Sequence, residues 1–204
     1  MANTNMIGVV GYESEDIVLY LAKLLCALEK KVAIVDRTEQ EMLIELLEVG
    51  TEREGEYEGI WITSQGVEKD KFDVIFFLFG YRLLHPKLYE CEVLIMVTDG
   101  VPAHASLLRK LGQWERRQCL VIRNLVAMKY GEQYLKMLVG QMETSCFVIP
   151  YEEQDTRIRC CLGTDTEICI RKLSKEMKQI VVELLLWLFS EYTEKDLRKK
   201  IKKL

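Results

Sequence analysis

The chain has 204 residues, of which 49% are hydrophobic and 29% are charged, and its formal net charge is −4. This length predicts one domain with a full hydrophobic core, and the composition is typical of a soluble globular protein. The acidic balance excludes a surface built to coat nucleic acid, so no nucleic-acid partner is expected.

The sequence has no pattern for export or for crossing a membrane. Residues 1–5 lack the basic and apolar regions of a secretory signal. The apolar run at residues 180–189 is shorter than a membrane span and contains Glu183. We therefore expect a cytoplasmic protein.

The seven cysteines are an odd number without a C-x-x-C pair, and His85 and His104 do not lie at zinc-binding spacing from them. We expect reduced thiols, and the alternative is a redox or metal role for Cys160 and Cys161. No metal site and no bound cofactor are predicted.

Residues 6–37 organise the chain as strand, tight turn, helix and strand. Residues 6–10 and 32–35 are short apolar runs without alternation, which is typical of strands buried on both faces. A strand, a crossover helix and a parallel strand form a right-handed βαβ unit, in which ligands bind at the carboxyl ends of the strands. This predicts a pocket at residues 11–16 with Asp36 beside it.

The stretch 6–37 resembles the opening of the ParA/MinD branch of P-loop ATPases. That family has an apolar strand, a glycine-rich loop ending in Gly-Lys-Thr, a helix, and a strand ending in Asp. The frame and Asp36 fit, but this chain has Tyr12-Glu13-Ser14-Glu15-Asp16 where the family has glycines, a phosphate-binding Lys and a Mg²⁺-binding hydroxyl. The resemblance therefore implies a phosphate loop that no longer works.

Two interpretations of this loop remain open. In the first, Ser14 caps the following helix, and Glu15 and Asp16 complement the helix dipole. In the second, the three carboxylates form a cation-bridged ligand site, because without a cation they would repel a polyphosphate.

After Asp36, the family pattern places a second Asp where this chain has Thr38, which we expect to cap a helix over residues 39–48. Residues 51–58 are expected to form an exposed loop. Residues 59–63 are expected to form a strand that pairs as an edge hairpin with the segment returning through 64–71.

Residues 72–80 are the most apolar strand and correspond to the family's second acidic motif. Asp73 matches its first residue, but the terminal Asp falls on Leu78 or Phe79, which cannot bind a cation. Four functional positions of the family are therefore replaced in this chain. They are the loop Lys, the Mg²⁺-binding hydroxyl, the Asp that corresponds to Thr38, and the terminal Asp of this strand. The resemblance therefore implies a pseudo-ATPase, a fold kept after ATP hydrolysis was lost.

The remaining chain continues the α/β alternation. Residues 81–89 are expected to form a loop or short helix. We expect strands at residues 93–98, 119–124 and 146–151, and helices from about 100 to 111, over 130–140, from about 155, and over 173–189. The strand at 119–124 ends at Asn124, where the family carries an Asn that can read the base.

Residues 191–204 are predicted to form a basic amphipathic tail, separate from a domain at residues 1–190. Leu197, Ile201 and Leu204 fall on one helical face. The pattern fits either a solvated helix end or a contact with an anionic membrane or an acidic partner. The residues that would make that contact are Arg198, Lys199, Lys202 and Lys203.

The sequence thus predicts a three-layer α/β domain with a mainly parallel sheet, resembling a degenerate ParA/MinD-type ATPase and, within that group, the TadZ/CpaE-like localisation proteins of pilus systems. The resemblance implies a non-catalytic scaffold or localisation protein, with homodimerisation and a place at the inner membrane face as further expectations. The alternative is a nucleotide-binding dimerisation switch. Tyr12 and Tyr81 are the expected contact anchors. The vestigial nucleotide pocket is predicted at Gly11, Tyr12, Glu13, Ser14, Glu15, Asp16, Asp36 and Asn124.

Overall fold

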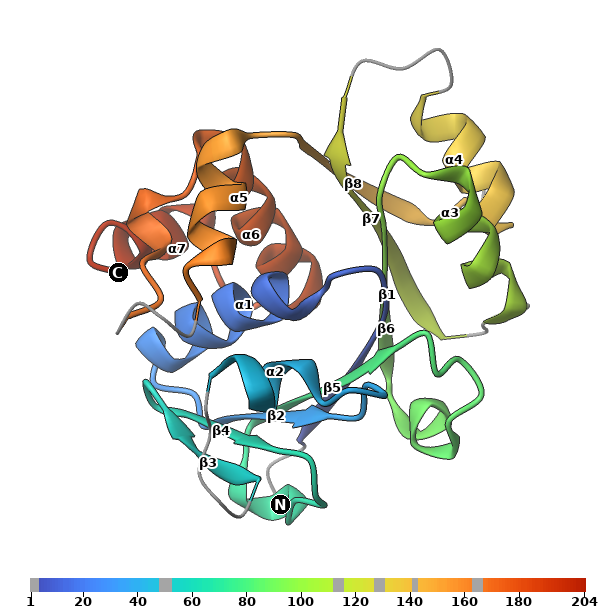
Figure 1. Cartoon of the computed structure of the whole chain (residues 1–204). Helices are drawn as coiled ribbons and strands as arrows, with labels where there is room; N and C mark the ends of the chain where they lie inside the picture. The colour runs from blue at the N-terminus through green and yellow to red at the C-terminus, as the bar shows by residue number, and fades with distance from the viewer. Residues whose placement is uncertain (1–3, 48–52, 112–115, 127–130, 141–142, 163–166) are drawn as a thin grey trace.

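The computed structural model describes residues 4–47, 53–111, 116–126, 131–140, 143–162 and 167–204. Their centre is an eight-stranded sheet in the order β3-β4-β2-β5-β1-β6-β7-β8, shown in Figure 1. The strands are β1 (Asn5–Gly11), β2 (Val32–Asp36), β3 (Glu54–Tyr57), β4 (Ile60–Thr63), β5 (Val74–Gly80), β6 (Val93–Thr98), β7 (Arg117–Leu125) and β8 (Ser145–Pro150).

Helices cover both faces of this sheet. They are α1 (Glu15–Ala27), α2 (Met42–Leu46), α3 (Pro102–Leu108), α4 (Glu132–Val139), α5 (Glu153–Cys160), α6 (Lys175–Leu188) and α7 (Glu194–Ile201). One hydrophobic cluster joins the sheet to α1, α2, α6 and α7, and a second joins the other face to α3 and α4. The predicted three-layer α/β architecture is confirmed.

All described strand pairs are parallel except β3 with β4. The two central strands β1 and β5 are buried along nearly their whole length, which is why their sequences read as continuous apolar runs rather than alternating ones. The parallel arrangement brings the carboxyl ends of β2, β5, β1, β6 and β7 to one edge of the sheet.

The edge hairpin is formed differently from the prediction. The segment expected to be an exposed loop contains β3, which pairs antiparallel with β4, so the partner strand precedes residues 59–63 instead of following them. Glu58 and Gly59 between the strands have φ values of 51° and 84°, as a two-residue type I′ hairpin turn requires. Glu58 also forms a 2.8 Å ion pair with Lys23 of α1, which holds this charged turn against the domain.

Some helix limits also differ. The helix expected over 39–48 begins at Met42, because residues 37–41 form a turn held by Asp36 and Thr38. The helix expected to reach residue 111 ends at Leu108, and a 3₁₀ turn continues to Leu111. The start of the helix expected over 130–140 lies outside the described residues.

The C-terminal helix α7 packs on the domain. Leu197 is fully buried and Ile201 is 6% exposed, both within the cluster that contains α1 and α6, and Lys200 Nζ donates a 2.7 Å hydrogen bond to the carbonyl of Ala27 at the end of α1. The apolar face of the predicted tail is therefore used for packing. Within the described part of the chain, no helix is long and apolar enough to cross a membrane.

We expect Leu197→Ala to lower the free energy of unfolding by about 2–5 kcal/mol, because it removes a fully buried side chain and leaves a cavity. Urea unfolding followed by circular dichroism measures this. The control Lys199→Ala truncates an exposed side chain of the same helix and should stay within about 0.5 kcal/mol of the natural sequence. Equal stabilities for the two variants would mean that α7 is not docked.

Candidate functional site

The candidate site lies where β1 passes into α1, at the carboxyl edge of the sheet. Gly11 has φ 111°, and a Cβ placed on it would lie 1.9 Å from the carbonyl oxygen of Val97. Tyr12 N donates a 2.9 Å hydrogen bond to the same oxygen. The loop therefore needs glycine at this position, because its backbone turns directly against β6.

Ser14 occupies the N-cap position of α1, but its side chain does not cap the helix. Its backbone is in the helical region (φ −96°, ψ −5°), whereas a capping side chain needs an extended backbone to reach the free N–H groups. The predicted Ser14 cap is therefore wrong. The Ser14 hydroxyl is fully buried, and it has no hydrogen-bond partner among the described residues.

Asp16, in the first turn of α1, forms a buried ion pair. Arg123, at the end of β7, meets it through two hydrogen bonds, Nη1 to Oδ1 at 2.8 Å and Nη2 to Oδ2 at 2.9 Å. The side chains are only 3% and 2% exposed. Burial opposes the charge on Arg123, but the surrounding carboxylates, Asp16 first, outweigh it and raise the pKa of the guanidinium.

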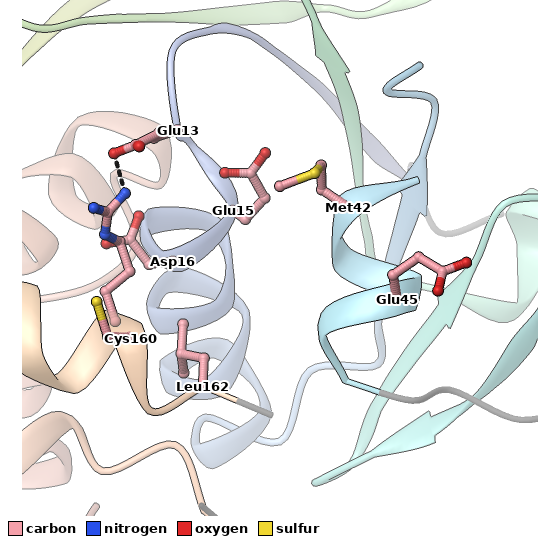
Figure 2. A pocket seen from close by; sticks show the side chains of 8 residues that line it. Glu13, Glu15, Asp16, Met42, Glu45, Cys160 and Leu162 are labelled. Carbon is pink, nitrogen blue, oxygen red and sulfur yellow. Dashed lines mark hydrogen bonds and ion pairs between the residues drawn. The ribbon is translucent and has the colours of Figure 1, made fainter. Parts of the chain in front are cut away.

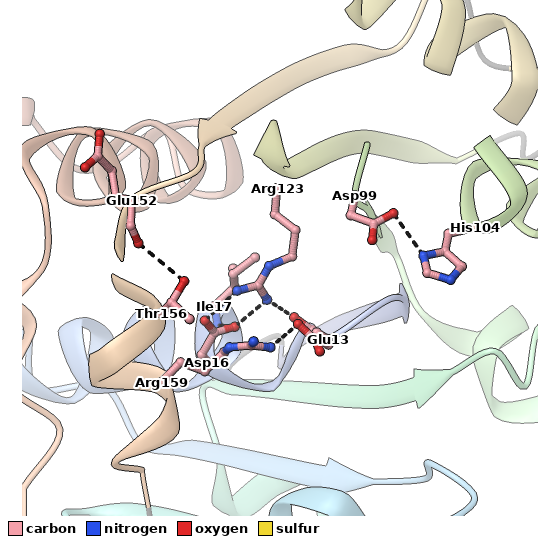
Figure 3. A network of polar contacts seen from close by, with 9 residues as sticks. All are labelled: Glu13, Asp16, Ile17, Asp99, His104, Arg123, Glu152, Thr156 and Arg159. Carbon is pink, nitrogen blue, oxygen red and sulfur yellow. Dashed lines mark hydrogen bonds and ion pairs between the residues drawn. The ribbon is translucent and has the colours of Figure 1, made fainter. Parts of the chain in front are cut away.

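A second ion pair continues the network shown in Figure 3. Arg159 on α5 pairs with the Glu13 carboxylate, and Arg123 Nη1 also donates to the Glu13 carbonyl. Both the Arg159 and Glu13 side chains are partly exposed. The loop before α1 is thus tied to β7 and to α5, and carboxylates of the protein itself occupy the N-terminal end of α1, where such folds present N–H groups to anions.

A cavity of about 440 Å³ opens beside this network (Figure 2). Burial, with smaller contributions from the charges of Asp16 and Asp36, raises the pKa of Glu15 in its wall. Three further carboxylates and a single guanidinium share the wall, so the cavity favours cationic over anionic ligands. The lining residues are Glu13, Glu15, Asp16, Met42, Glu45, Arg159, Cys160 and Leu162.

The Asp36 side chain stabilises the turn between β2 and α2. Its carboxylate accepts hydrogen bonds from Thr38 N at 2.9 Å, Thr38 Oγ1 at 2.7 Å and Leu43 N at 2.7 Å. Thr38 Oγ1 in turn accepts from Met42 N at 3.1 Å. Thr38 therefore bonds to the first residue of α2, but the N-cap position predicted for it belongs to Glu41. These contacts engage both oxygens of Asp36 in organising the turn into α2.

Asn124 lies at the same edge of the sheet but does not line the cavity. It has φ 53° and sits where the register between β7 and β8 shifts. Leu78 and Phe79, on which the sequence resemblance places the second acidic position, are fully buried. The structure thus brings residues 11–16 together at the end of α1, whereas Asp36 and Asn124 lie outside the cavity wall.

A small aromatic cluster borders the loop on its β6 side. The Tyr12 ring stacks on His104 with 4.5 Å between ring centroids, and Tyr81 lies 6.4 Å from the same imidazole. His104 Nδ1 is 2.9 Å from Asp99 Oδ1. Tyr12 and Tyr81, predicted from distant sequence positions, therefore share one surface.

Sequence reasoning missed Arg123, Arg159, Asp99 and His104. One signal was present for Arg123, because an arginine directly following the apolar run 119–122 must be buried or end its strand. No group of His, Cys, Asp or Glu side chains that could hold a metal ion occurs in the described ranges. None of the seven cysteines is in a disulfide, and Cys160 and Cys161 are exposed.

The chain has the fold of ParA/MinD-type P-loop ATPases. A ParA family ATPase from Chlorobium tepidum superposes with a TM-score of 0.64 at 13% identity, covering 94% of this chain and 100% of that chain. A chain of the MinC:MinD cell division protein complex of Aquifex aeolicus superposes with a TM-score of 0.60 at 11% identity, covering 89% of this chain and 96% of that chain. A plasmid partition protein from Borrelia burgdorferi superposes with a TM-score of 0.57 at 13% identity, covering 92% of this chain and 100% of that chain.

These likenesses concern the fold, since the identities are low. The sequence matches no protein-family model and no curated protein.

Proposed function

We propose that this chain is a non-catalytic pseudo-ATPase that acts as a scaffold or localisation protein. The observation that carries the proposal is that Asp16 and Glu13, at the start of α1, are each paired with an arginine. The loop at residues 11–16 contains no lysine, and the family's acidic position at the end of β5 is apolar. The chain would keep the ParA/MinD-type fold without its phosphate chemistry.

Electrostatics explain why ATP would be a poor ligand here. Two unit charges about 4 Å apart interact by about 4 kcal/mol at an effective dielectric near 20, so an ionised Glu15 would repel a triphosphate. The triphosphate would also have to compete with Asp16 and Glu13 for their arginines. Displacing Asp16 would also leave a buried charge unpaired, which costs several kcal/mol. These two terms oppose nucleotide binding at the end of α1.

A protein partner is the natural ligand of such a scaffold. One structure with the same fold is solved as a MinC:MinD complex, and we propose that this chain likewise works through a protein partner, or a second copy of itself. A place in pilus or secretion-system assembly at the cytoplasmic face of the membrane is the finer form of this proposal, and it rests on the resemblance to TadZ/CpaE-like proteins.

The proposed contact anchors are Tyr12 and Tyr81, of which Tyr81 is 39% exposed. We expect Tyr12→Ala/Tyr81→Ala to abolish partner capture or self-association, measured by pull-down and by sedimentation. Tyr89→Ala, which truncates an exposed tyrosine elsewhere, should leave both unchanged. If the double variant also leaves both unchanged, these tyrosines are not the anchors.

The alternative function is a nucleotide-binding dimerisation switch. Only the size and position of the cavity, about 440 Å³ beside the α1 N-terminus, support it, because the carboxylates of the wall oppose an anion. Arg159 in the cavity wall is the cation that a nucleotide would meet. This alternative requires the Arg159–Glu13 pair to open.

A thermal unfolding scan with millimolar Mg²⁺–ATP or Mg²⁺–ADP separates the two functions. We expect no shift and no ATP turnover, because the carboxylates close the site to phosphates. A ligand at about 100 times its Kd would add about 2.7 kcal/mol and raise the midpoint by several degrees. The control variant is Lys110→Ala, which truncates an exposed lysine of the 3₁₀ turn after α3. A rise of the unfolding midpoint with nucleotide that disappears in Arg159→Ala but persists in Lys110→Ala would establish the switch instead.

A further inference from the structure

A basic groove lies between α6 and α7, and it is separate from the cavity beside α1. Its volume is about 520 Å³. Five of the residues that line it are cationic and none is acidic: Arg171, Lys175, Lys178, Arg198 and Lys202, with Ile201 as the apolar residue. We call this the α6–α7 groove. Figure 1 shows these two helices side by side at the C-terminal end of the chain.

Most of these cations lack a carboxylate partner. The side chains of Arg171, Lys175 and Lys202 are in exposed residues and make no hydrogen bond or ion pair within the part of the chain that the structure describes. Lys178 Nζ donates only to the carbonyl of Arg171, at 3.2 Å. Arg198 alone is neutralised, by Glu194 at 2.7 Å. The groove therefore holds positive charge that the fold does not use.

Helix electrostatics make Lys175 unfavourable for the fold. It is the first residue of α6, where the positive end of the helix dipole disfavours a cation. The helix start does not depend on it, because Ser174 Oγ accepts a 2.9 Å hydrogen bond from Met177 N and caps α6. The dipole of α6 and the lysine instead act together on whatever anion enters the groove.

The charge of this region opposes that of the chain. Residues 171–203 contain ten Lys and Arg against five Asp and Glu, although the whole chain has a net charge of −4. The four cations of the groove other than Arg198 carry more charge than a single carboxylate or phosphate could balance. Arginine and lysine together suit phosphate groups, the former through its planar fork and the latter as a compact charge.

We infer that the α6–α7 groove binds a compact anion that carries several phosphate groups. Recognition would be by charge, because the apolar face of α7 is packed inside the domain and cannot insert elsewhere. The source of the phosphates is either a soluble polyphosphate compound or the headgroups of an anionic membrane. The inference does not depend on the function proposed for the α1 site.

The test uses the full chain with two probes. Inorganic tripolyphosphate is titrated by isothermal calorimetry, and phosphatidylcholine vesicles with or without phosphatidylglycerol are used in co-sedimentation. The variants are Lys175→Glu and Lys202→Glu, and the matched control is Lys110→Glu, which makes the same charge change at an exposed lysine of the 3₁₀ turn after α3. Thermal unfolding verifies that each variant is folded.

We expect each groove variant to bind at least about tenfold more weakly, because it replaces an attractive charge by a repulsive one. Lys110→Glu should bind as the natural sequence does, and added salt should weaken binding throughout. This pattern with tripolyphosphate assigns the groove to a soluble phosphate compound, and the same pattern with phosphatidylglycerol vesicles alone assigns it to headgroups. Binding of neither probe, or equal weakening by all three variants, would overturn the inference.

Discussion

Arg123→Met is expected to lower the free energy of unfolding by about 3–5 kcal/mol, because it leaves the Asp16 carboxylate buried without its cation. The loss also removes the hydrogen bond to the Glu13 carbonyl, which should loosen the loop before α1. Guanidinium unfolding gives the free energy, and amide hydrogen exchange of residues 11–17 reports the loop.

Two further variants show whether pairing is the cause. Arg171→Met removes an exposed arginine that has no partner among the described residues and should change stability by no more than about 0.5 kcal/mol. The double variant Asp16→Leu/Arg123→Met removes both charges and should regain most of the loss, since apolar replacements of buried pairs are often neutral or stabilising. A double variant as unstable as Arg123→Met alone would contradict the explanation by an unpaired charge.

Gly11→Ala is expected to destabilise the chain by at least about 3 kcal/mol. Alanine rarely adopts φ 111°, and its Cβ would overlap the Val97 carbonyl oxygen at 1.9 Å, so β1 and β6 would have to separate locally. Chemical unfolding measures the loss, and near-ultraviolet dichroism reports the packing around Tyr12.

The matched control for this substitution is Gly66→Ala. Nothing lies within 4 Å of a Cβ at Gly66, and its φ is outside the range that L-residues avoid. Its stability should lie within about 0.5 kcal/mol of the natural sequence. If Gly11→Ala were tolerated as well as Gly66→Ala, the loop would have an alternative path away from β6.

Much of the fold follows from local patterns. The uninterrupted apolar runs of β1, β2, β5 and β6 predict strands buried on both faces, and the helical spacing of Ile17, Leu21, Leu24 and Leu25 predicts α1. These patterns are strong because a fully buried strand has no solvent-facing residues to interrupt it. The pairing of β3 with β4 was harder to predict, because β3 lies on the sheet edge and contains charged residues. Such a sequence is also typical of an exposed loop.

By itself, the sequence determined the alternation of strands and helices, the parallel sheet, and the lysine-free loop at residues 11–16. Only the tertiary structure decided what those loop residues do. Arg123 and Asp16, which form the buried ion pair, are 107 positions apart in the sequence. The Ser14 side chain does not cap α1 as expected, because its backbone angles are helical. The same holds for α7, whose apolar face meets α1 from the other end of the chain. Local patterns specify which side chains must be buried, but the partner of a buried charge or an apolar face depends on how distant elements pack.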